Sequence, residues 1–263
     1  MSYLFDPKVT ERRRRLTAGR KEHLVLELQR RLMADMLQPA FARSLLDIGC
    51  GTGESLVPFL NKGIDLTGID PCVHMLGEAR RNLGNRVELY KGYAEDLPFD
   101  DNSFNYTVIF LTLGFCEEPF RAVEEACRVT RDRIFIGIIN KFSLYAVQCR
   151  AVRLLKPHTG TQPRLFSIGE IRRMLFCLLG RVPLKWQTVF QVPWLPHPLI
   201  QSMESTGIFR SSPFGGFAGM TADPVPSFRA QPLALKCRIH QPAPRGEQVA
   251  SCAGDYRDEK LEN

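Results

Sequence analysis

Short apolar runs alternate with amphipathic segments over residues 44 to 139. This pattern limits the folds open to the chain more than any other feature of the sequence. Five apolar runs are typical of buried strands, at 44–48, 65–69, 86–89, 106–111 and 133–139. Helical spacing of apolar residues predicts helices between them, at 53–61, 71–82 and 119–129. Parallel strands joined through helices need right-handed crossovers. This pattern therefore predicts a doubly wound, Rossmann-like α/β fold with helices on both faces of the sheet.

The chain after residue 139 is expected to complete this sheet. Two β-like runs at 184–192 and 232–239 would bring it to seven, mostly parallel, strands. Residues 140–183 look helical, whereas the many prolines and glycines of 193–229 predict a long irregular connection. Gly215, Gly216 and Gly219 would let that connection close over a ligand. We therefore expect residues 140–240 to combine substrate-covering insertions with the last strands.

The two ends of the chain differ from this central part. Leucines and methionines recur at broadly helical spacing over residues 11–37, which predicts one or two amphipathic helices within an N-terminal segment, 1–43. From residue 241 onward the sequence is polar and charged, and we expect a disordered tail over 241–263. The prediction is a single domain over residues 1–240.

Cysteine spacing and charge exclude several classes of protein. The eight cysteines are never closer than eleven residues, so no CxxC pair is present for metal or redox chemistry, and we expect buried thiols and no metal. No apolar run approaches the roughly 20 residues that span a bilayer, and we expect a cytoplasmic protein. The net charge is +7. Its excess lies mostly in residues 1–43, around Arg12–Arg15, where a solvated helix face is more usual than a polyanion site.

A glycine-rich turn, LDIGCGTG, follows the first predicted strand at residues 46–53. Glycines there allow a sharp turn and let a ligand approach the main chain. Dinucleotide-binding proteins use a similar turn, but their spacing is GxGxxG, whereas this sequence has GxGxG. Asp47 precedes the first glycine by two positions and would repel a pyrophosphate while attracting an ammonium group. The turn therefore favours a ligand that is cationic at this point.

An acidic residue, Asp70, ends the second predicted strand, nineteen residues after Gly51. A carboxylate at the tip of that strand can accept two hydrogen bonds from a ribose diol. The same side chain could instead cap the helix that begins at Pro71. Together with the glycine turn, Asp70 indicates an adenosine-like ligand.

A third segment, GYAEDLPFDDNSF at residues 92–104, completes a resemblance to a known family. LDIGCGTG, GID at 68–70 and AEDLPFDDNSF resemble class I S-adenosylmethionine-dependent methyltransferases, the group that includes ubiquinone- and menaquinone-biosynthesis enzymes. The resemblance covers about residues 40–140 and implies that S-adenosyl-L-methionine is the cofactor and that 44–139 is the cofactor-binding half.

The resemblance implies a set of cofactor-binding positions: Asp47, Gly49, Cys50, Gly51, Gly53, Asp70, Pro71, Tyr93, Ala94, Glu95, Phe110 and Leu111. In the family, the glycine turn surrounds the methionine end of the cofactor and the position of Asp70 holds the ribose. The positions of Tyr93–Glu95 line the adenine pocket. Phe110 and Leu111 are expected beneath the methionine chain. Two departures are visible: Tyr93 replaces a frequent Asp or Asn, and residues 130–133 replace the usual proline-glycine-glycine turn.

The sequence does not name the methyl acceptor or a catalytic base. Histidines 158 and 197 lie in the long variable regions, and His74 is expected on a helix surface. Aromatic residues in or beside those regions favour a small apolar or planar acceptor: Tyr3, Phe5, Phe142, Tyr145, Phe190, Trp194, Phe209, Phe214 and Phe217. Two alternatives stay open. One is an RNA or protein methyltransferase that uses the basic N-terminus, and the other is a non-catalytic interaction module with this fold.

Overall fold

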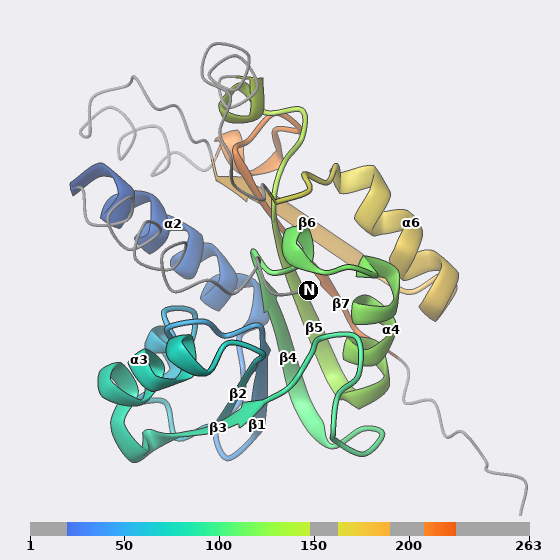
Figure 1. Ribbon diagram of the computed structural model, residues 1–263. Helices are drawn as coiled ribbons and strands as arrows, with labels where there is room; N and C mark the ends of the chain where they lie inside the picture. Colours follow the sequence, from blue (N-terminus) through green and yellow to red (C-terminus); the bar gives the residue numbers. More distant parts are fainter. Residues whose placement is uncertain (1–19, 148–162, 190–207, 225–263) are drawn as a thin grey trace, which may run out of the picture. The chain divides into compact units, whose positions relative to one another are not determined.

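The computed structural model describes residues 20–147, 163–189 and 208–224. These residues contain a seven-stranded sheet in the order β3-β2-β1-β4-β5-β7-β6 (Figure 1). The strands are β1 Ser44–Ile48, β2 Asp65–Asp70, β3 Val87–Lys91, β4 Phe104–Phe110, β5 Thr130–Ile139, β6 Leu184–Val189 and β7 Phe217–Ala222. Strands β1 to β5 are mutually parallel, and β7 runs antiparallel to both of its neighbours. The predicted seven-stranded, mostly parallel α/β sheet is confirmed.

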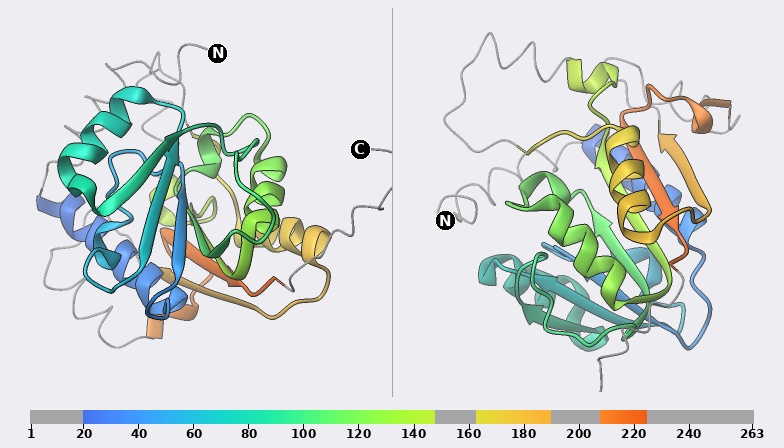
Figure 2. Two further views of the ribbon diagram at one scale, coloured as in Figure 1. Left: turned by 90° about the horizontal axis from the view of Figure 1, so that it is seen from below. Right: turned by 90° about the vertical axis from the view of Figure 1, so that its right-hand side faces the viewer.

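Helices cover both faces of this sheet, as Figures 1 and 2 show. Helix α2 Arg20–Leu37 and helix α3 Val73–Leu83 lie on one face, where Met33 and Leu83 join the same apolar cluster as Leu45 of β1. Helix α4 Pro119–Val129 and helix α6 Ile168–Leu179 cover the other face. Because the central strands are buried on both sides, they read as continuous apolar runs.

The sequence predicted the first five strands and two of the three connecting helices closely. Strand β1 and helix α4 have the predicted bounds, and α3 begins two residues later than expected. The N-terminal helix begins at Arg20 within the described residues, and α6 provides the predicted helix after residue 140. The predicted tail lies outside the described residues. No helix in the described ranges is long and apolar enough to cross a membrane.

The prediction of a helix over 53–61 is wrong. This stretch consists of tight turns around a short 3-10 helix, Val57–Phe59, in which the amides of Leu56, Phe59 and Leu60 each donate to a carbonyl three residues earlier. Pro58 has no N–H to give to the carbonyl of residue 54, so an α-helix starting at Gly53 would lack a bond in its first turns.

The prediction of an irregular connection over 193–229 is also wrong for the part of this range that the structure describes. Phe217–Ala222 forms β7, a fully buried strand between β5 and β6. The run predicted as the seventh strand, 232–239, lies outside the described residues. Gly219 serves packing here, because a Cβ on it would lie 2.8 Å from a ring carbon of Phe135. A glycine expected to give mobility is therefore required by close contact within the sheet.

Candidate functional site

The glycine turn lies between the tips of β1 and β2. The amides of Gly49 and Cys50 both donate to the carbonyl oxygen of Ile69, at 2.7 and 3.0 Å. Gly49, Gly51 and Gly53 all have left-handed backbone angles, with φ of +73°, +55° and +81°. L-residues with a Cβ rarely adopt these angles, so the turn depends on glycine. Bonding to Ile69 places the turn beside Asp70, the next residue along β2.

Close packing against the end of β4 restricts Gly49 further. A Cβ on Gly49 would lie 2.1 Å from Cγ2 of Thr112, whose hydroxyl donates to the Gly49 carbonyl at 3.2 Å. Leu111, the preceding residue, has a left-handed φ of +59°, an uncommon conformation for leucine that is typical of functional sites. A Cβ on Gly51 would meet only Met75, at 3.6 Å. The main chain at Gly51 is therefore open to a ligand, whereas that at Gly49 is closed by protein.

The carboxylate of Asp70 organises the turn. One oxygen accepts from the Gly51 amide at 2.9 Å, and the other accepts from the Cys72 amide at 2.8 Å. Helix α3 begins at Val73 with Cys72 as its N-cap, so Asp70 precedes the cap position and does not cap the helix directly. Asp70 thus joins the tip of β2 to the glycine turn after β1 and to the residue before α3.

The second carboxylate, Asp47, is fully buried inside β1. One of its oxygens accepts a short hydrogen bond from the Ser55 hydroxyl, and the other has no partner among the described residues. Burial raises the pKa of Asp47 to about 7, the Ser55 hydrogen bond opposes this rise, and the charge of Asp70 adds to it. A buried carboxylate with a free oxygen is costly unless a positive group compensates it. Asp47 therefore fits a cationic part of a ligand.

We predict that Asp47→Asn stabilises the ligand-free protein at alkaline pH. The ordinary pKa of an aspartate is 3.8, and that of Asp47 is about 7, so between these values the folded protein holds a proton that the unfolded chain has released. The stability that the protonated Asp47 side chain gives the folded protein is complete below about pH 4 and is lost as the pH rises to about 7. Above pH 7 the loss approaches about 4 kcal/mol, because one pKa unit corresponds to about 1.4 kcal/mol.

Urea unfolding at pH 5 and pH 8 measures this effect. The gain in unfolding free energy from Asp47→Asn should widen between the two pH values. The matched control is Asp65→Asn, which makes the same substitution at the exposed start of β2. A gain that is equal at both pH values would contradict the assignment of this titration to Asp47.

The third predicted segment follows β3 and lies beside Asp70. The Gly92 amide donates to the Asp70 carbonyl at 3.4 Å. Tyr93 is 56% exposed and Ala94 is buried. One carboxylate oxygen of Glu95 accepts from the amides of Glu117 and Glu118, at 2.9 and 3.4 Å. The structure therefore brings Tyr93 and Ala94 next to the Asp70 strand tip, whereas the Glu95 carboxylate binds the segment before α4.

Three other predicted cofactor-binding positions, Cys50, Pro71 and Phe110, have side chains that pack against protein or lie beside Asp70. The Cys50 thiol is buried against β2, since a Cβ on Gly68 would lie 2.8 Å from its sulfur, and burial raises the pKa of this thiol. Only the main chain of Cys50 is thus available to a ligand. Pro71 lies between Asp70 and Cys72 and is half-buried. The ring of Phe110 packs on Phe217 with centroids 5.5 Å apart.

The aromatic residues proposed for acceptor binding separate into distinct groups. Phe142 and Phe214 are each 60% exposed near the carboxyl end of β5, where the Asn140 amide group donates to the carbonyls of Pro213 and Gly215. Tyr145 is half-buried, and Phe217 is fully buried in the core. His74 is exposed on α3. The other candidates lie at positions whose side chains are outside the described part: Tyr3, Phe5, Arg12–Arg15, His158, Phe190, Trp194, His197 and Phe209.

Sequence reasoning missed Thr112 and Ser55, two hydroxyl residues that complete the turn. Thr112 packs on Gly49, and Ser55 binds Asp47. Thr112 directly follows Leu111 at the carboxyl end of β4, a position where site residues of such sheets gather. Within the described ranges, no three His, Cys, Asp or Glu side chains are grouped to hold a metal ion.

Comparison with known proteins identifies one family over the same residues. Residues 46–135 match the family model described as a methyltransferase domain. An uncharacterized methyltransferase of Mycobacterium bovis is 37% identical over 105 residues, which are 40% of this chain and 42% of that protein. A demethylmenaquinone methyltransferase of Paenarthrobacter aurescens is 34% identical over 102 residues, 39% of this chain and 40% of the relative. The resemblance drawn from the three motifs is confirmed.

These matches are partial, and the chain spans about two fifths of the length of the curated relatives it matches. A solved SAM-dependent methyltransferase of Thermotoga maritima, described as a possible histamine N-methyltransferase, covers more of the chain. It has a TM-score of 0.60 and 23% identity over 84% of this chain and 97% of its own. At that identity the likeness establishes the fold.

Proposed function

We propose, starting from the methyltransferase domain that residues 46–135 match, that this protein is an S-adenosylmethionine-dependent methyltransferase. The observation that carries the proposal is the joint geometry of the turn and Asp70, in which one carboxylate binds the amides of Gly51 and Cys72 while the main chain at Gly51 stays open. A binding module without a nucleoside ligand would need neither the left-handed glycines nor the acid at the strand tip.

The residues present fit the parts of this cofactor. The buried Asp47, with one unpartnered oxygen, suits the ammonium group of the methionine part. The Asp70 carboxylate, at the tip of β2 beside the glycine turn, suits the ribose diol, and Tyr93 and Ala94 lie where they can line an adenine pocket. We further propose that Gly49, Gly51 and Gly53 shape the turn, and that Phe110 and Leu111 lie beneath the methionine chain.

S-adenosylmethionine, when bound, supplies a methyl group that its sulfonium has already activated. The chain therefore needs no covalent intermediate. Its residues have to hold the acceptor in line with the methyl group and exclude water, which can contribute several kcal/mol through orientation. A general base is needed only where the acceptor must lose a proton.

We propose a small-molecule acceptor that binds beyond the carboxyl ends of β4 and β5. Ligands of open α/β sheets bind at that edge, and the exposed rings of Phe142 and Phe214 lie near the end of β5. One relative is named for demethylmenaquinone, and the Thermotoga protein is described as a possible histamine N-methyltransferase. Both names support a small acceptor over a macromolecule.

Calorimetric titration with S-adenosylhomocysteine, the demethylated cofactor, tests the cofactor assignment. We predict that Asp70→Ala weakens binding by about 1.5–3 kcal/mol, the scale of hydrogen bonds to a charged group, which is at least about tenfold in affinity. Asp65→Ala, at the exposed opposite end of the same strand, is the matched control and should bind like the wild type. Absence of binding by the folded wild-type protein would refute the proposed function.

The acceptor class is tested separately. The protein is incubated with methyl-labelled cofactor and a cell extract, and the label is followed into small molecules, RNA and protein. Label in small molecules supports the proposal. Label in RNA or protein that is lost when Arg12–Arg15 are replaced by Gln would favour a polyanionic or macromolecular acceptor instead.

A further inference from the structure

We propose that Arg128 is a positioning residue for the adenine end of the cofactor site, an inference that rests on the proposed function. It concerns residues 92–103, the connection from β3 to β4, which has no helix or strand apart from an isolated bridge between Tyr93 and Asp96. This connection carries Tyr93–Glu95. A segment without regular structure cannot hold a ligand in one orientation unless other contacts fix it.

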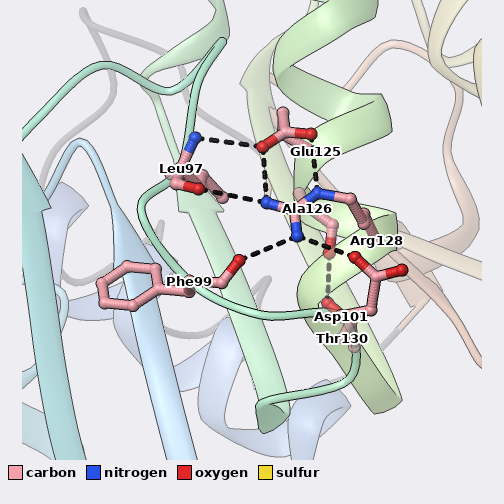
Figure 3. Close-up of polar contacts among 7 residues, drawn as sticks. All are labelled: Leu97, Phe99, Asp101, Glu125, Ala126, Arg128 and Thr130. Carbon is pink, nitrogen blue, oxygen red and sulfur yellow. Dashed lines mark hydrogen bonds and ion pairs between the residues drawn. The ribbon is translucent and has the colours of Figure 1, made fainter.

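The Arg128 guanidinium binds this connection at three points (Figure 3). It donates to the carbonyl oxygens of Leu97 and Phe99 at 3.1 and 2.8 Å, and to the Asp101 carboxylate at 2.8 Å. Its remaining donors form a fork on Glu125, one turn earlier on α4, at 2.8 and 2.7 Å. Glu125 in turn accepts from the Leu97 amide at 3.0 Å. All three nitrogens of the guanidinium are therefore engaged.

Burial makes these contacts stronger than those of a surface ion pair. The side chains of Arg128 and Glu125 are 19% and 16% exposed. Burial alone would raise the pKa of Glu125, but hydrogen bonds from the Arg128 side chain and the Leu97 amide hold it below its ordinary value. A planar guanidinium can bind a carboxylate with two parallel bonds and still reach two carbonyls, which lysine cannot do.

The opposite end of the same connection is fixed at the ribose position. The Gly92 amide donates to the carbonyl of Asp70, and Glu95 binds the amides of Glu117 and Glu118. Tyr93 and Ala94 thus lie between an anchor on β2 and the anchors on α4. Because Leu97 is three residues from Ala94, loss of the Arg128 contacts would loosen the adenine side of the segment, which would then be held only by Glu95 and the Leu97 amide, while the Asp70 side stays attached.

A purely structural role is the competing explanation, and Arg133 provides a matched control for it. Arg133 also donates to both oxygens of one carboxylate, that of Asp223, at 2.6 and 3.0 Å, and to a main-chain carbonyl, that of Leu37. Its side chain is 29% exposed, and it lies near the start of β5, away from the candidate site. Arg128→Met and Arg133→Met therefore each remove a two-bond contact with one carboxylate and contacts with main-chain carbonyls, from different places.

The experiment compares the binding of S-adenosylhomocysteine and S-inosylhomocysteine, which differ only at one edge of the base: the 6-amino group becomes a carbonyl, and N1 changes from an acceptor to a donor. The wild type should prefer the adenosyl compound by at least about tenfold, as expected where a site hydrogen-bonds an amino group. Arg128→Met should reduce this preference to below about threefold, and Arg133→Met should keep it. A loss of stability by itself does not change the ratio of two affinities measured on folded protein.

Arg128→Lys keeps the positive charge and provides a second variant in case Arg128→Met does not fold. It should fold and show a preference between those of the wild type and Arg128→Met, because an ammonium group cannot occupy all three points at once. An unchanged preference in both Arg128 variants, with the wild type binding normally, would overturn the inference and leave the proposed function intact. Failure of the wild type to bind either compound would instead overturn the proposed function.

Discussion

Gly49→Ala is expected to abolish measurable binding of S-adenosylhomocysteine while most of the sheet stays folded. The new Cβ would lie 2.1 Å from Cγ2 and 2.6 Å from the hydroxyl of Thr112, so the turn between β1 and β2 would have to move. A left-handed angle adds about 1–2 kcal/mol for a residue with a Cβ, and overpacking adds about 1–3 kcal/mol. Movement of the turn would separate the Gly51 amide from Asp70, on which the proposed cofactor site depends.

Two comparisons isolate the cause of this effect. Gly84→Ala introduces a Cβ at a similarly positive φ, +65°, with ψ −145° and no atom within 4 Å, so it measures a backbone cost without a steric clash. The double variant Gly49→Ala/Thr112→Ala removes the two closest atoms and should recover part of the binding. Calorimetry gives the affinity for S-adenosylhomocysteine and thermal unfolding gives the stability. Both are measured on the wild type, the two single variants and the double variant. Normal binding by Gly49→Ala would show that the turn is not the cofactor site.

Phe217→Ala is expected to destabilise the protein by about 3–5 kcal/mol, the usual cost of deleting a buried phenylalanine. Phe217 is fully buried at the start of β7 and contacts Phe110, and a Cβ on Gly137 would lie only 2.7 Å from its ring. This prediction follows from β7 being a core strand. A role for the same residue in a mobile cover over the substrate would predict altered turnover with little change in stability.

Phe214→Ala is the control, three residues earlier in the same segment. Its ring is 60% exposed, so we expect its loss to change the unfolding free energy by less than about 0.5 kcal/mol. If Phe214 contacts the acceptor, this variant should lower methyl transfer without lowering stability. Chemical unfolding of the two variants separates the assignments, and equal stability of Phe217→Ala and the wild type would contradict the core position of β7.

The part of the fold that the sequence predicted is the part in which local and long-range preferences agree. The runs of β1 and β4 are short, mostly apolar and largely buried, so their hydrophobic pattern is the pattern of the finished sheet. Helix α4 starts with Pro119 at its first turn and buries one face, and both signals are visible in the sequence.

The sequence-based predictions failed where a glycine or proline has a role that only the tertiary structure shows. Gly215 and Gly219 suggested a mobile loop, but a Cβ on Gly215 would lie 2.4 Å from Thr188, and one on Gly219 would meet Phe135. These contacts join residues far apart in the chain, so no local pattern encodes them. Pro58 was visible, but the short run of tight turns around it also carries apolar residues at helical spacing.

The candidate site shows the same division. Asp47, Asp70 and the glycines could be named because their types and spacing follow from the strand-turn-helix geometry. The partners Ser55, Thr112 and Arg128 could not, since a serine, threonine or arginine has no pattern that marks it until the structure shows what it binds. Sequence reasoning therefore named the candidate ligand-binding groups and missed the side chains that hold them in place.

The position of β7 also affects how the chain assembles during synthesis. Strand β6 precedes β7 in the sequence but joins the sheet only through it, while β5 gains its second neighbour only when β7 is present. Ala222 is translated about 80 residues after Ile139, which takes roughly 4–16 s at ribosomal rates of about 5–20 residues per second. During that interval the edge of β5 has unpaired amides and carbonyls, and β6, which is translated before β7, is available to pair with it incorrectly. Insertion of β7 between them closes this edge and so protects the sheet from mispairing and aggregation.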